Sequence, residues 1–264
     1  MTSTLRSSDG RVVVPARLRQ RRVEVRRNEG RRRLRRVGAA GVVVVILLAA
    51  WAILRSPLLA VHDVEVLGSS HVTEADVQRA TGLGAGTAMI DVRPGAVARK
   101  LEALPWVATA SVSRSWPTDV TITLTERRPL AQIGHGRSWA LVDASGRVIE
   151  RRTARAAGLP VLADLNAGAA GSHVARSASL LAAVSDMPRS LRADVAQFGY
   201  TSKGAVALTL AGDGVVTLGR PDGLPAKFAS LTTMLDHLGT LHSGCTLDVS
   251  VPEAPTLTPE KDCA

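Results

Sequence analysis

The sequence is poor in several residue types on which catalytic and metal sites depend. Aromatic residues make up 3% of its 264 residues, and there are two cysteines, Cys245 and Cys263. No CxxC or CxH spacing accompanies them, which argues against a thiolate zinc site. The sequence also has no GxSxG elbow, no SxxK pair, no P-loop and no HExxH helix. These absences predict a protein that is not an enzyme and has no metal, cofactor or small-molecule substrate.

Three weaker candidates for a ligand or catalytic site have simpler explanations. The glycines of TGLGAG, residues 81–86, do not have the GxGxxG spacing and no strand leads directly into them, so they predict a helix end followed by a turn. His237 and His242 are five residues apart and cannot share a helical face as zinc ligands usually do. Asp143 lies in a turn beside Gly146, where an Asx turn accounts for it.

Acidic residues are scarce at the N-terminus, where the positive charge is concentrated. Residues 1–36 contain 13 arginines and three acidic residues, and this excess of ten equals the net charge of the whole chain, +10. The rest of the chain therefore sums to zero, which argues against a nucleic-acid interface on its folded part. The arm could bind nucleic acid through phosphates, but it has no aromatic residue for base stacking. We expect a disordered arm held near anionic lipid headgroups.

One long apolar run follows this arm. The 18 residues from Val37 to Leu54 carry no charge, and as a helix they span about 27 Å, close to the thickness of the bilayer core. An aromatic residue near one end, Trp51, is typical of the membrane interface. We predict a transmembrane helix over residues 37–55, anchored by Val42, Val43, Val44, Val45, Ile46, Leu47, Leu48 and Trp51.

The flanks of the run predict its direction in the membrane. Arginines crowd its N-terminal side whereas only Arg55 follows it, so the positive-inside rule places the N-terminus in the cytoplasm and the bulk of the chain outside, a single-pass type II arrangement. A cleaved signal peptide is the alternative, because Ala50 and Ala52 form a small-x-small pair. The 36-residue segment before the run and Trp51 within the cleavage site favour an uncut anchor.

Residues 58–128 show the pattern of a small α+β domain. A short strand is predicted at 61–67, and Thr73 is a good N-cap for the helix that follows it. A second helix is predicted over 92–104, where apolar residues recur at three- and four-residue spacing. Two strands, 106–116 and 120–125, then form a hairpin around the turn sequence WPTD. The predicted order is strand, helix, helix, strand, strand.

Residues 129–253 predict a second, mostly-β domain with flanking helices. It opens with a short hairpin made by residues 139–142 and 146–149. A helix, three strands, a second helix and a last strand are predicted after it, over about 175–185, 195–200, 205–210, 215–218, 227–238 and 246–251. Residues 254–264 are predicted to be a C-terminal tail outside the domain.

The order of these elements, together with a set of spaced residues, resembles the FtsQ family of bacterial cell-division proteins, also called DivIB. The first outer domain is similar to the POTRA domain of that family, and the resemblance covers roughly residues 37–257. In the first domain and the start of the second it is carried by Leu101, Pro105, Trp106, Val107, Ala110, Val112, Arg114, Trp116, Pro117, Val120, Ile122, Leu124, Glu126, Arg127, Pro129 and Ala131. Farther along the second domain it is carried by residues 139–143, 146–149, 159–162 and 218–220.

The resemblance implies a fold, a role and partners. The fold class is α+β, with a single transmembrane helix, a POTRA (β-α-α-β-β) domain and a second mostly-β domain with flanking helices. The role is that of a bitopic scaffold of the divisome, at the division septum of the cell membrane. There it binds FtsB, FtsL and other division proteins and helps to control septal peptidoglycan synthesis. The alternative is a membrane-anchored POTRA protein for secretion or envelope assembly.

The resemblance also assigns FtsB binding to the last strands of the second domain. A short terminal strand is expected to be a sheet edge with unpaired backbone groups, to which a partner segment can add itself as another strand. The predicted docking residues are Thr246, Leu247, Asp248, Val249, Ser250 and Val251. Family members often have Asp, an apolar residue, Arg and Tyr, then Gly at this point, so their side-chain contacts do not carry over. An ordinary edge blunted by the prolines that follow is the alternative.

The two cysteines lie on the predicted outer side of the membrane. A disulfide is chemically permitted there. Residue spacing alone leaves both a bridge between Cys245 and Cys263 and two free thiols open.

Overall fold

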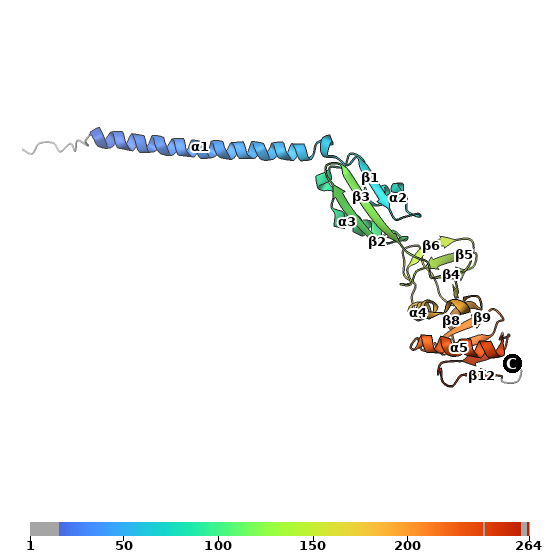
Figure 1. The fold of residues 1–264 in the computed structure, drawn as a ribbon. Helices are drawn as coiled ribbons and strands as arrows, with labels where there is room; N and C mark the ends of the chain where they lie inside the picture. Colours follow the sequence, from blue (N-terminus) through green and yellow to red (C-terminus); the bar gives the residue numbers. More distant parts are fainter. Residues whose placement is uncertain (1–15, 240, 260–262, 264) are drawn as a thin grey trace, which may run out of the picture.

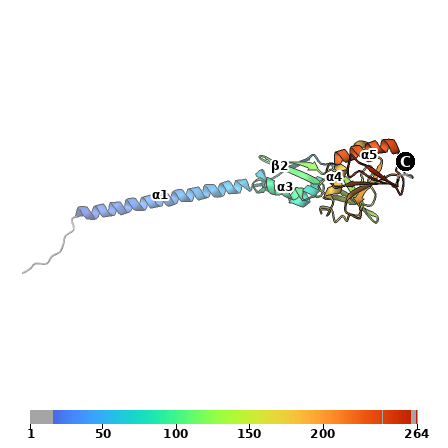
Figure 2. The same cartoon turned by 90° about the horizontal axis from the view of Figure 1, so that it is seen from below.

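A computed structural model describes residues 16–239, 241–259 and 263. It begins with one long helix, α1 (Ala16–Leu54), which leads through a short 3-10 turn, η1 (Pro57–Leu59), into two folded units (Figure 1). Seen from two directions, the C-terminal end of the chain lies at the end of the molecule opposite α1 (Figure 2). The last strands are therefore the part of the fold farthest from the apolar helix.

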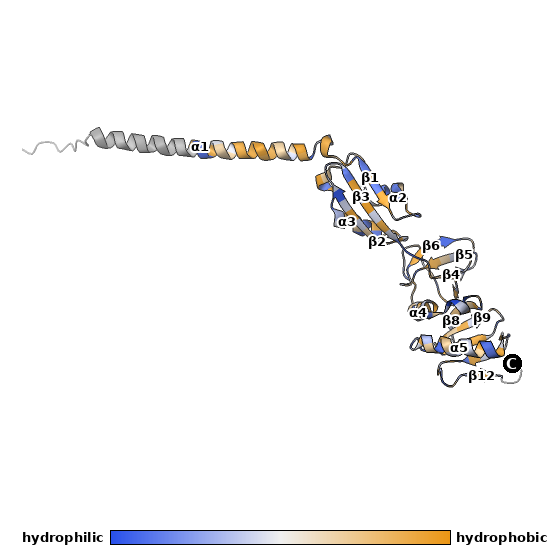
Figure 3. Ribbon diagram, viewed as in Figure 1, coloured by the Kyte–Doolittle hydropathy of each residue, from blue (hydrophilic) through white to orange (hydrophobic). Residues whose placement is uncertain are grey.

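Helix α1 contains the predicted membrane anchor. Its stretch Leu34–Leu54 is long and apolar enough to cross a membrane, with a mean hydropathy of 2.7, and it forms the hydrophobic end of the helix in Figure 3. The predicted anchor side chains are 53% to 65% exposed, so the rest of the described chain does not cover them. The expectation of a disordered arm is wrong for residues 16–36, which continue the helix because the stretch is rich in arginine and contains no proline. The other part of that arm, residues 1–15, lies outside the described residues.

The first unit has the predicted order of elements. It consists of β1 (Asp63–Leu67), α2 (Glu74–Thr81), α3 (Pro94–Glu102), β2 (Val107–Ser115) and β3 (Asp119–Glu126), with a one-turn 3-10 helix, η2 (Met89–Asp91), before α3. The sheet order is β1-β3-β2, in which β1 is parallel to β3 and β2 is antiparallel to it. Side chains from both helices and from the sheet, among them Val77, Leu101 and Ile122, share one buried core. The alternation of apolar and polar residues predicted these strands correctly because only one face of the sheet is buried.

Thr73 caps helix α2 as the sequence predicts. Its hydroxyl oxygen accepts a hydrogen bond from the backbone N–H of Asp76 at 3.2 Å, and the Asp76 carboxylate accepts one from the Thr73 N–H at 2.9 Å. We expect Thr73→Ala to lower the free energy of unfolding by about 1 kcal/mol, because it leaves a helix N–H without its partner. Urea titration of the full chain in micelles measures the loss, and Thr73→Ser is the control that keeps the cap. Equal stability of the alanine and serine variants would show that the cap contributes nothing.

The second unit is built on a nine-stranded sheet. Its strands are β4 (Ala131–His135), β5 (Ser138–Val142), β6 (Val148–Arg152), β7 (Val161–Leu162), β8 (Val195–Tyr200), β9 (Val206–Leu210), β10 (Val215–Gly219), β11 (Thr246–Asp248) and β12 (Thr256–Thr258). They lie in the order β12-β11-β10-β9-β8-β7-β4-β5-β6, so β12 and β6 form the two edges. Two helices, α4 (Ala178–Asp186) and α5 (Leu224–Leu238), and a 3-10 turn, η3 (Arg189–Arg192), accompany the sheet.

Helices α4 and α5 share one core with this sheet. Buried side chains of both helices, such as Leu181 and Phe228, lie in the same apolar cluster as Phe198 and Leu208 of the sheet. The cluster also contains Cys263, so the prediction of a tail outside the domain over residues 254–264 is wrong. The last described residues fold back onto the second unit, to which they add strand β12 and the buried side chain of Cys263.

A short segment and a set of polar contacts join the two units. The N–H of Arg127, just after β3, donates to the carbonyl oxygen of Trp106 at 2.8 Å, which fixes the start of the connection. The Arg127 guanidinium then donates to the Asp143 carboxylate at 2.7 Å. From the second unit, the guanidinium of Arg147 donates at 2.9 Å to the carbonyl oxygen of Ala103, at the end of α3. These bonds cross from one unit to the other and hold them together.

Candidate functional site

The predicted docking strand is shorter than the sequence suggests. Strand β11 covers Thr246–Asp248 and is parallel to β10, with Thr246 opposite Val215. It ends where the N–H of Ser250 donates to the Asp248 carboxylate at 2.8 Å, an Asx turn that takes the chain out of the ladder. Val249, Ser250 and Val251 therefore lie outside the strand, although the Val249 N–H still donates to the Thr217 carbonyl oxygen at 2.9 Å.

The edge of the sheet is β12, and the prediction that the strand beginning at Thr246 forms the edge is wrong. Strand β12 pairs antiparallel with β11, with Thr258 opposite Thr246 and Leu257 opposite Leu247. Strand β11 is thus an interior strand of the sheet. Strand β12 is hard to predict from sequence, because it has three residues and stands between Pro255 and Pro259, where a tail is the simpler interpretation.

The outer side of β12 is open. Thr256 and Thr258 are exposed, whereas Leu257 is partly buried and packs against the apolar core. Across the ranges that the structure describes, no strand pairs with β12 on the side away from β11. Its outward backbone groups are therefore free to pair with a segment of another chain.

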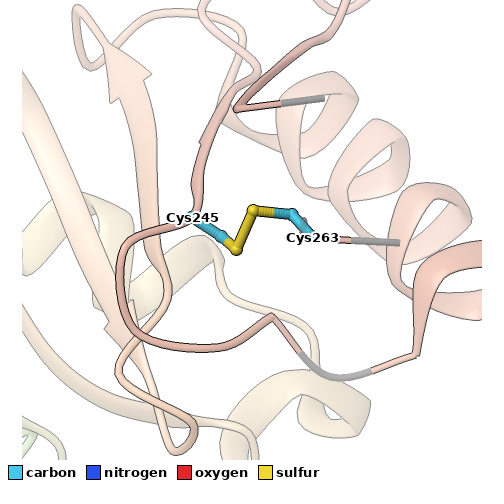
Figure 4. Close-up of a disulfide and its surroundings, with 2 residues drawn as sticks. All are labelled: Cys245 and Cys263. Carbon is cyan, nitrogen blue, oxygen red and sulfur yellow. A yellow bond between two sulfur atoms is a disulfide. The ribbon is translucent and has the colours of Figure 1, made fainter. Parts of the chain in front are cut away.

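A disulfide between Cys245 and Cys263 closes the end of this strand pair (Figure 4). The cysteines are 18 positions apart in sequence, their Cα atoms are 5.7 Å apart, and both residues are at least 95% buried. Cys245 directly precedes Thr246, which is the residue opposite Thr258. In the chain-entropy account, a loop of this length raises the free energy of unfolding by about 3 kcal/mol.

A positively charged cleft of about 560 Å³ lies beside the end of β11 and is lined by Lys203, Arg220, Lys227, Ser250 and Val251 among others. The Lys227 side chain is 5% exposed, and its ammonium donates to the carbonyl oxygen of Arg220 at 2.8 Å and to the Asp222 carboxylate at 3.0 Å. The hydrogen bond from Lys227 lowers the pKa of Asp222. Lys227 thus holds the turn before α5, which leaves Lys203 and Arg220 at the surface of the cleft.

The residues considered as catalytic or metal ligands have structural places. The N–H of Ser145 donates to the Asp143 carboxylate at 2.8 Å, which is the predicted Asx turn. The Nδ1 of His237 contacts the Thr233 carbonyl oxygen on the exposed side of α5, while His242 belongs to the loop after that helix. Among the residues whose side chains are described, no group of three or more histidine, cysteine or acidic residues could hold a metal ion.

A group of hydrogen bonds around the carboxylate of Glu126, which the sequence did not predict, lies at the end of β3. Glu126 accepts hydrogen bonds from the hydroxyl of Ser69 at 2.6 Å, the N–H of Ser70 at 2.8 Å and the N–H of His71 at 2.6 Å. Burial opposes ionisation, but the hydrogen bonds outweigh it and hold the pKa of Glu126 well below its usual range. The ring of His71 also stacks on Trp106 at a centroid distance of 3.7 Å. The sequence signal was the pair Glu126-Arg127, which gave no indication of a partner more than 50 positions earlier.

Comparison with known proteins matches both folded units to named families. A family model described as "POTRA domain, FtsQ-type" matches residues 59–127, and one described as "Cell division protein FtsQ/DivIB, C-terminal" matches residues 131–250. A cell division protein FtsQ of Streptomyces collinus is 30% identical to this chain over 241 residues, which are 86% of this chain and 89% of the relative. The chain belongs to the FtsQ/DivIB family.

Other relatives support the same family. The chain is 27% identical to a cell division protein FtsQ of Streptomyces bingchenggensis over 86% of its own length and 87% of the relative. It is 28% identical to one of Mycolicibacterium smegmatis over 83% of its own length, but that match spans 63% of the longer relative. Membership in the family and the apolar N-terminal helix together make this chain a membrane-anchored protein of cell division.

The family match and the candidate docking site overlap only in part. The FtsQ/DivIB C-terminal match begins at the first residue of β4 and ends at residue 250, just after β11. Strand β12 and Cys263 lie beyond it. The FtsQ-type domains therefore account for the fold up to β11, whereas the edge strand and its disulfide have to be interpreted from this structure.

Proposed function

We propose that this chain is a non-catalytic scaffold of the divisome, whose outer region binds an FtsB-type partner by strand addition on β12. Through FtsB and FtsL it would take part in the assembly that supports and regulates septal peptidoglycan synthesis. The observation that carries the proposal is the open outer side of β12, because an unpaired strand edge offers backbone hydrogen bonds to an added strand.

Two features near β12 favour a peptide partner. Val251, in the loop between β11 and β12, is 55% exposed and offers an apolar anchor beside the edge. The cleft with Lys203 and Arg220 offers positive charge on the same side of the unit. Backbone pairing would supply affinity, and these neighbouring side chains would supply specificity.

The place of β12 in the molecule agrees with a partner that extends away from the membrane. It belongs to the end of the molecule opposite the apolar helix (Figure 1). A partner anchored in the same membrane must reach that distance, as a small coiled-coil membrane protein such as FtsB or FtsL can. A globular partner close to the membrane would instead meet the first unit.

We further propose the topology and domain boundaries that the sequence predicts, with one change. Residues 1–36 lie in the cytoplasm, 37–55 cross the membrane, and the POTRA domain of residues 58–128 lies outside at the septum. The β domain begins at 129 and extends to 263 instead of 253, because β12 and Cys263 belong to it. A disulfide persists in oxidising compartments, which supports an outer position for this domain.

Replacing Leu257 with proline tests strand addition. The ring removes one N–H of β12 and fits poorly in a paired strand, so we expect the Kd for the outer segment of FtsB from the same cell to rise by about tenfold or more. Binding is measured with the full chain in lipid nanodiscs, with the outer segment of FtsL tested in parallel.

The control for a proline in an edge strand is Arg152→Pro, at the end of β6 on the opposite edge of the same sheet. Both variants place one proline in an edge strand, but only the first alters the proposed docking edge. Equal binding by both variants and the wild type would exclude β12 as the docking site. Binding of neither FtsB nor FtsL by the wild type would overturn the proposed partners, while the family of the chain would stand.

A further inference from the structure

The edge strand β12 has little of its own to hold it in place. It has three residues, within the described part of the chain it pairs on one side only, and two of its three side chains are exposed. Strands this short, paired with a single neighbour, are marginal unless something else fixes them. The loop of residues 249–255 connects β12 to β11 at one end, and the disulfide connects them at the other.

The disulfide is placed where it fixes the register of the two strands. Cys245 is already part of the sheet, because its carbonyl oxygen accepts from the Val215 N–H at 2.9 Å and its own N–H donates to the His242 carbonyl oxygen at 3.1 Å. The bond from Cys245 to Cys263 therefore ties the chain after β12 to a fixed point next to the Thr246–Thr258 pair. Closing the open end of an antiparallel pair in this way restricts slippage of β12 along β11.

We propose that oxidation of Cys245 and Cys263 is a maturation step that makes the docking edge, and that a thiol–disulfide oxidoreductase of the cell envelope carries it out. The inference rests on the proposed function, because it concerns the same edge. It adds a class of enzyme that acts on this chain before a partner can bind to β12 with full affinity.

The reaction is thiol–disulfide exchange in two steps. A thiolate of one cysteine attacks the disulfide of the oxidoreductase, which forms a mixed disulfide and releases one enzyme thiolate. The second cysteine, as its thiolate, attacks the sulfur of its partner in this mixed disulfide and displaces the other enzyme thiolate. The chain loses two electrons and two protons, and the oxidoreductase, now a dithiol, gains them.

Because the Cys245–Cys263 disulfide is buried, the cysteines must be oxidised before β12 pairs with β11. In the folded unit Cys245 is 4% exposed and Cys263 is 5% exposed, so an enzyme cannot reach either sulfur once β12 is in place. Oxidation of the cysteines therefore precedes the pairing of β12 with β11, and the buried disulfide is then protected from reductants. This describes a single assembly step and not a reversible switch.

The first test measures amide hydrogen exchange in β12 with the full chain in lipid nanodiscs. In Cys245→Ala/Cys263→Ala we expect the β12 amides that pair with β11 to exchange about tenfold faster than in the wild type, while the POTRA strands β2 and β3 stay unchanged. Cys263→Ala alone removes the bond and leaves the buried Cys245 side chain in the core, so it serves if the double variant folds poorly. Unchanged exchange at β12 in the variant that folds would overturn the inference.

The second test compares partner binding by the same proteins. We expect the Kd for the outer segment of FtsB to be about tenfold higher for the cysteine variant than for the disulfide-bonded wild type. Equal binding would refute the role of the bond in docking, even if exchange at β12 had increased. If the wild type itself binds nothing, the proposed function fails, and the exchange experiment still decides whether the disulfide holds β12.

The third test concerns the oxidoreductase. Thiols of the full chain are trapped with a maleimide in cells depleted of their envelope thiol–disulfide oxidoreductase. We expect two thiols to react in depleted cells and none in untreated cells. Formation of the disulfide to the same extent in both would overturn the proposal that such an enzyme makes it.

Discussion

Replacing Asp143 with alanine is expected to lower the free energy of unfolding by about 3 kcal/mol, because it leaves the guanidinium of Arg127 without its partner in a place where that side chain is 17% exposed. The carboxylate has further bonds to lose, since it also accepts from the N–H groups of Ser145 and Arg147. Burial opposes its ionisation, but the hydrogen bonds from Ser145, Arg127 and Arg147 prevail and lower its pKa. Urea titration of the full chain in micelles measures the loss.

Two further variants separate the roles of Asp143. Asp143→Asn keeps a carbonyl oxygen for the turn but removes the charge that pairs with Arg127, so it isolates the contact between the units. Arg127→Met combined with Asp143→Ala removes both partners, and we expect its loss to be smaller than the sum of the single losses by about 1 kcal/mol or more. Additive losses would show that the pair does not couple the units.

The contact between the units matters for the proposed function because it fixes where the docking edge lies relative to the membrane. Arg127 and Arg147 connect the end of the POTRA domain to the turn after β5. Strand β12 lies at the other end of the same nine-stranded sheet. A change of angle between the two units would therefore displace the docking edge more than the strands near the joint, because β12 lies at the far edge of the sheet.

The sequence predicted the POTRA domain well because local and long-range signals agree there. Thr73 caps its helix, Pro105 lies two residues after the C-cap of the next one, and Val120, Ile122 and Leu124 alternate with threonines along a strand that is buried on one face. Each of these signals lies within a few residues of the element that it specifies. The apolar run of α1 is of the same kind, since its length and composition alone identify it.

The candidate site was less accessible to sequence analysis because it depends on pairings between distant segments. The propensity of Thr256–Thr258 is ordinary, and these residues form a strand because β11 provides a neighbour for them. Likewise, the pairing of Cys245 with Cys263 follows from the return of the chain to the core, which spacing does not reveal. For the basic arm the error is of another kind: its high charge predicted disorder, whereas the backbone of residues 16–36 is helical.

Replacing Glu126 with glutamine is expected to lower the free energy of unfolding at pH 7 by about 2 kcal/mol, because charge-assisted hydrogen bonds from Ser69, Ser70 and His71 become weaker neutral ones. The amide keeps the size and one acceptor of the carboxylate, so the core of the POTRA domain is not disturbed. The carboxylate joins the loop before α2 to the end of β3, more than 50 positions later in sequence. The variant therefore tests a contact that closes the domain.

The pH dependence of stability distinguishes this charge from a purely steric role. The folded pKa of Glu126 lies below its ordinary value of 4.5, so the unfolded chain takes up the proton first as the pH falls. The stabilisation is fully present above about pH 5.5 and is lost as the pH decreases through the unfolded pKa toward the folded one. The difference in stability between wild type and Glu126→Gln should therefore begin to shrink below about pH 5 and go on shrinking as the pH falls toward the folded pKa, although other carboxylates lower the stability of both. The Nδ1 of His71 lies 2.9 Å from this carboxylate, so His71→Ala is the control that removes the ring contact while leaving the charge on Glu126. A difference between wild type and Glu126→Gln that stayed constant over this range would mean that the carboxylate acts through its shape alone.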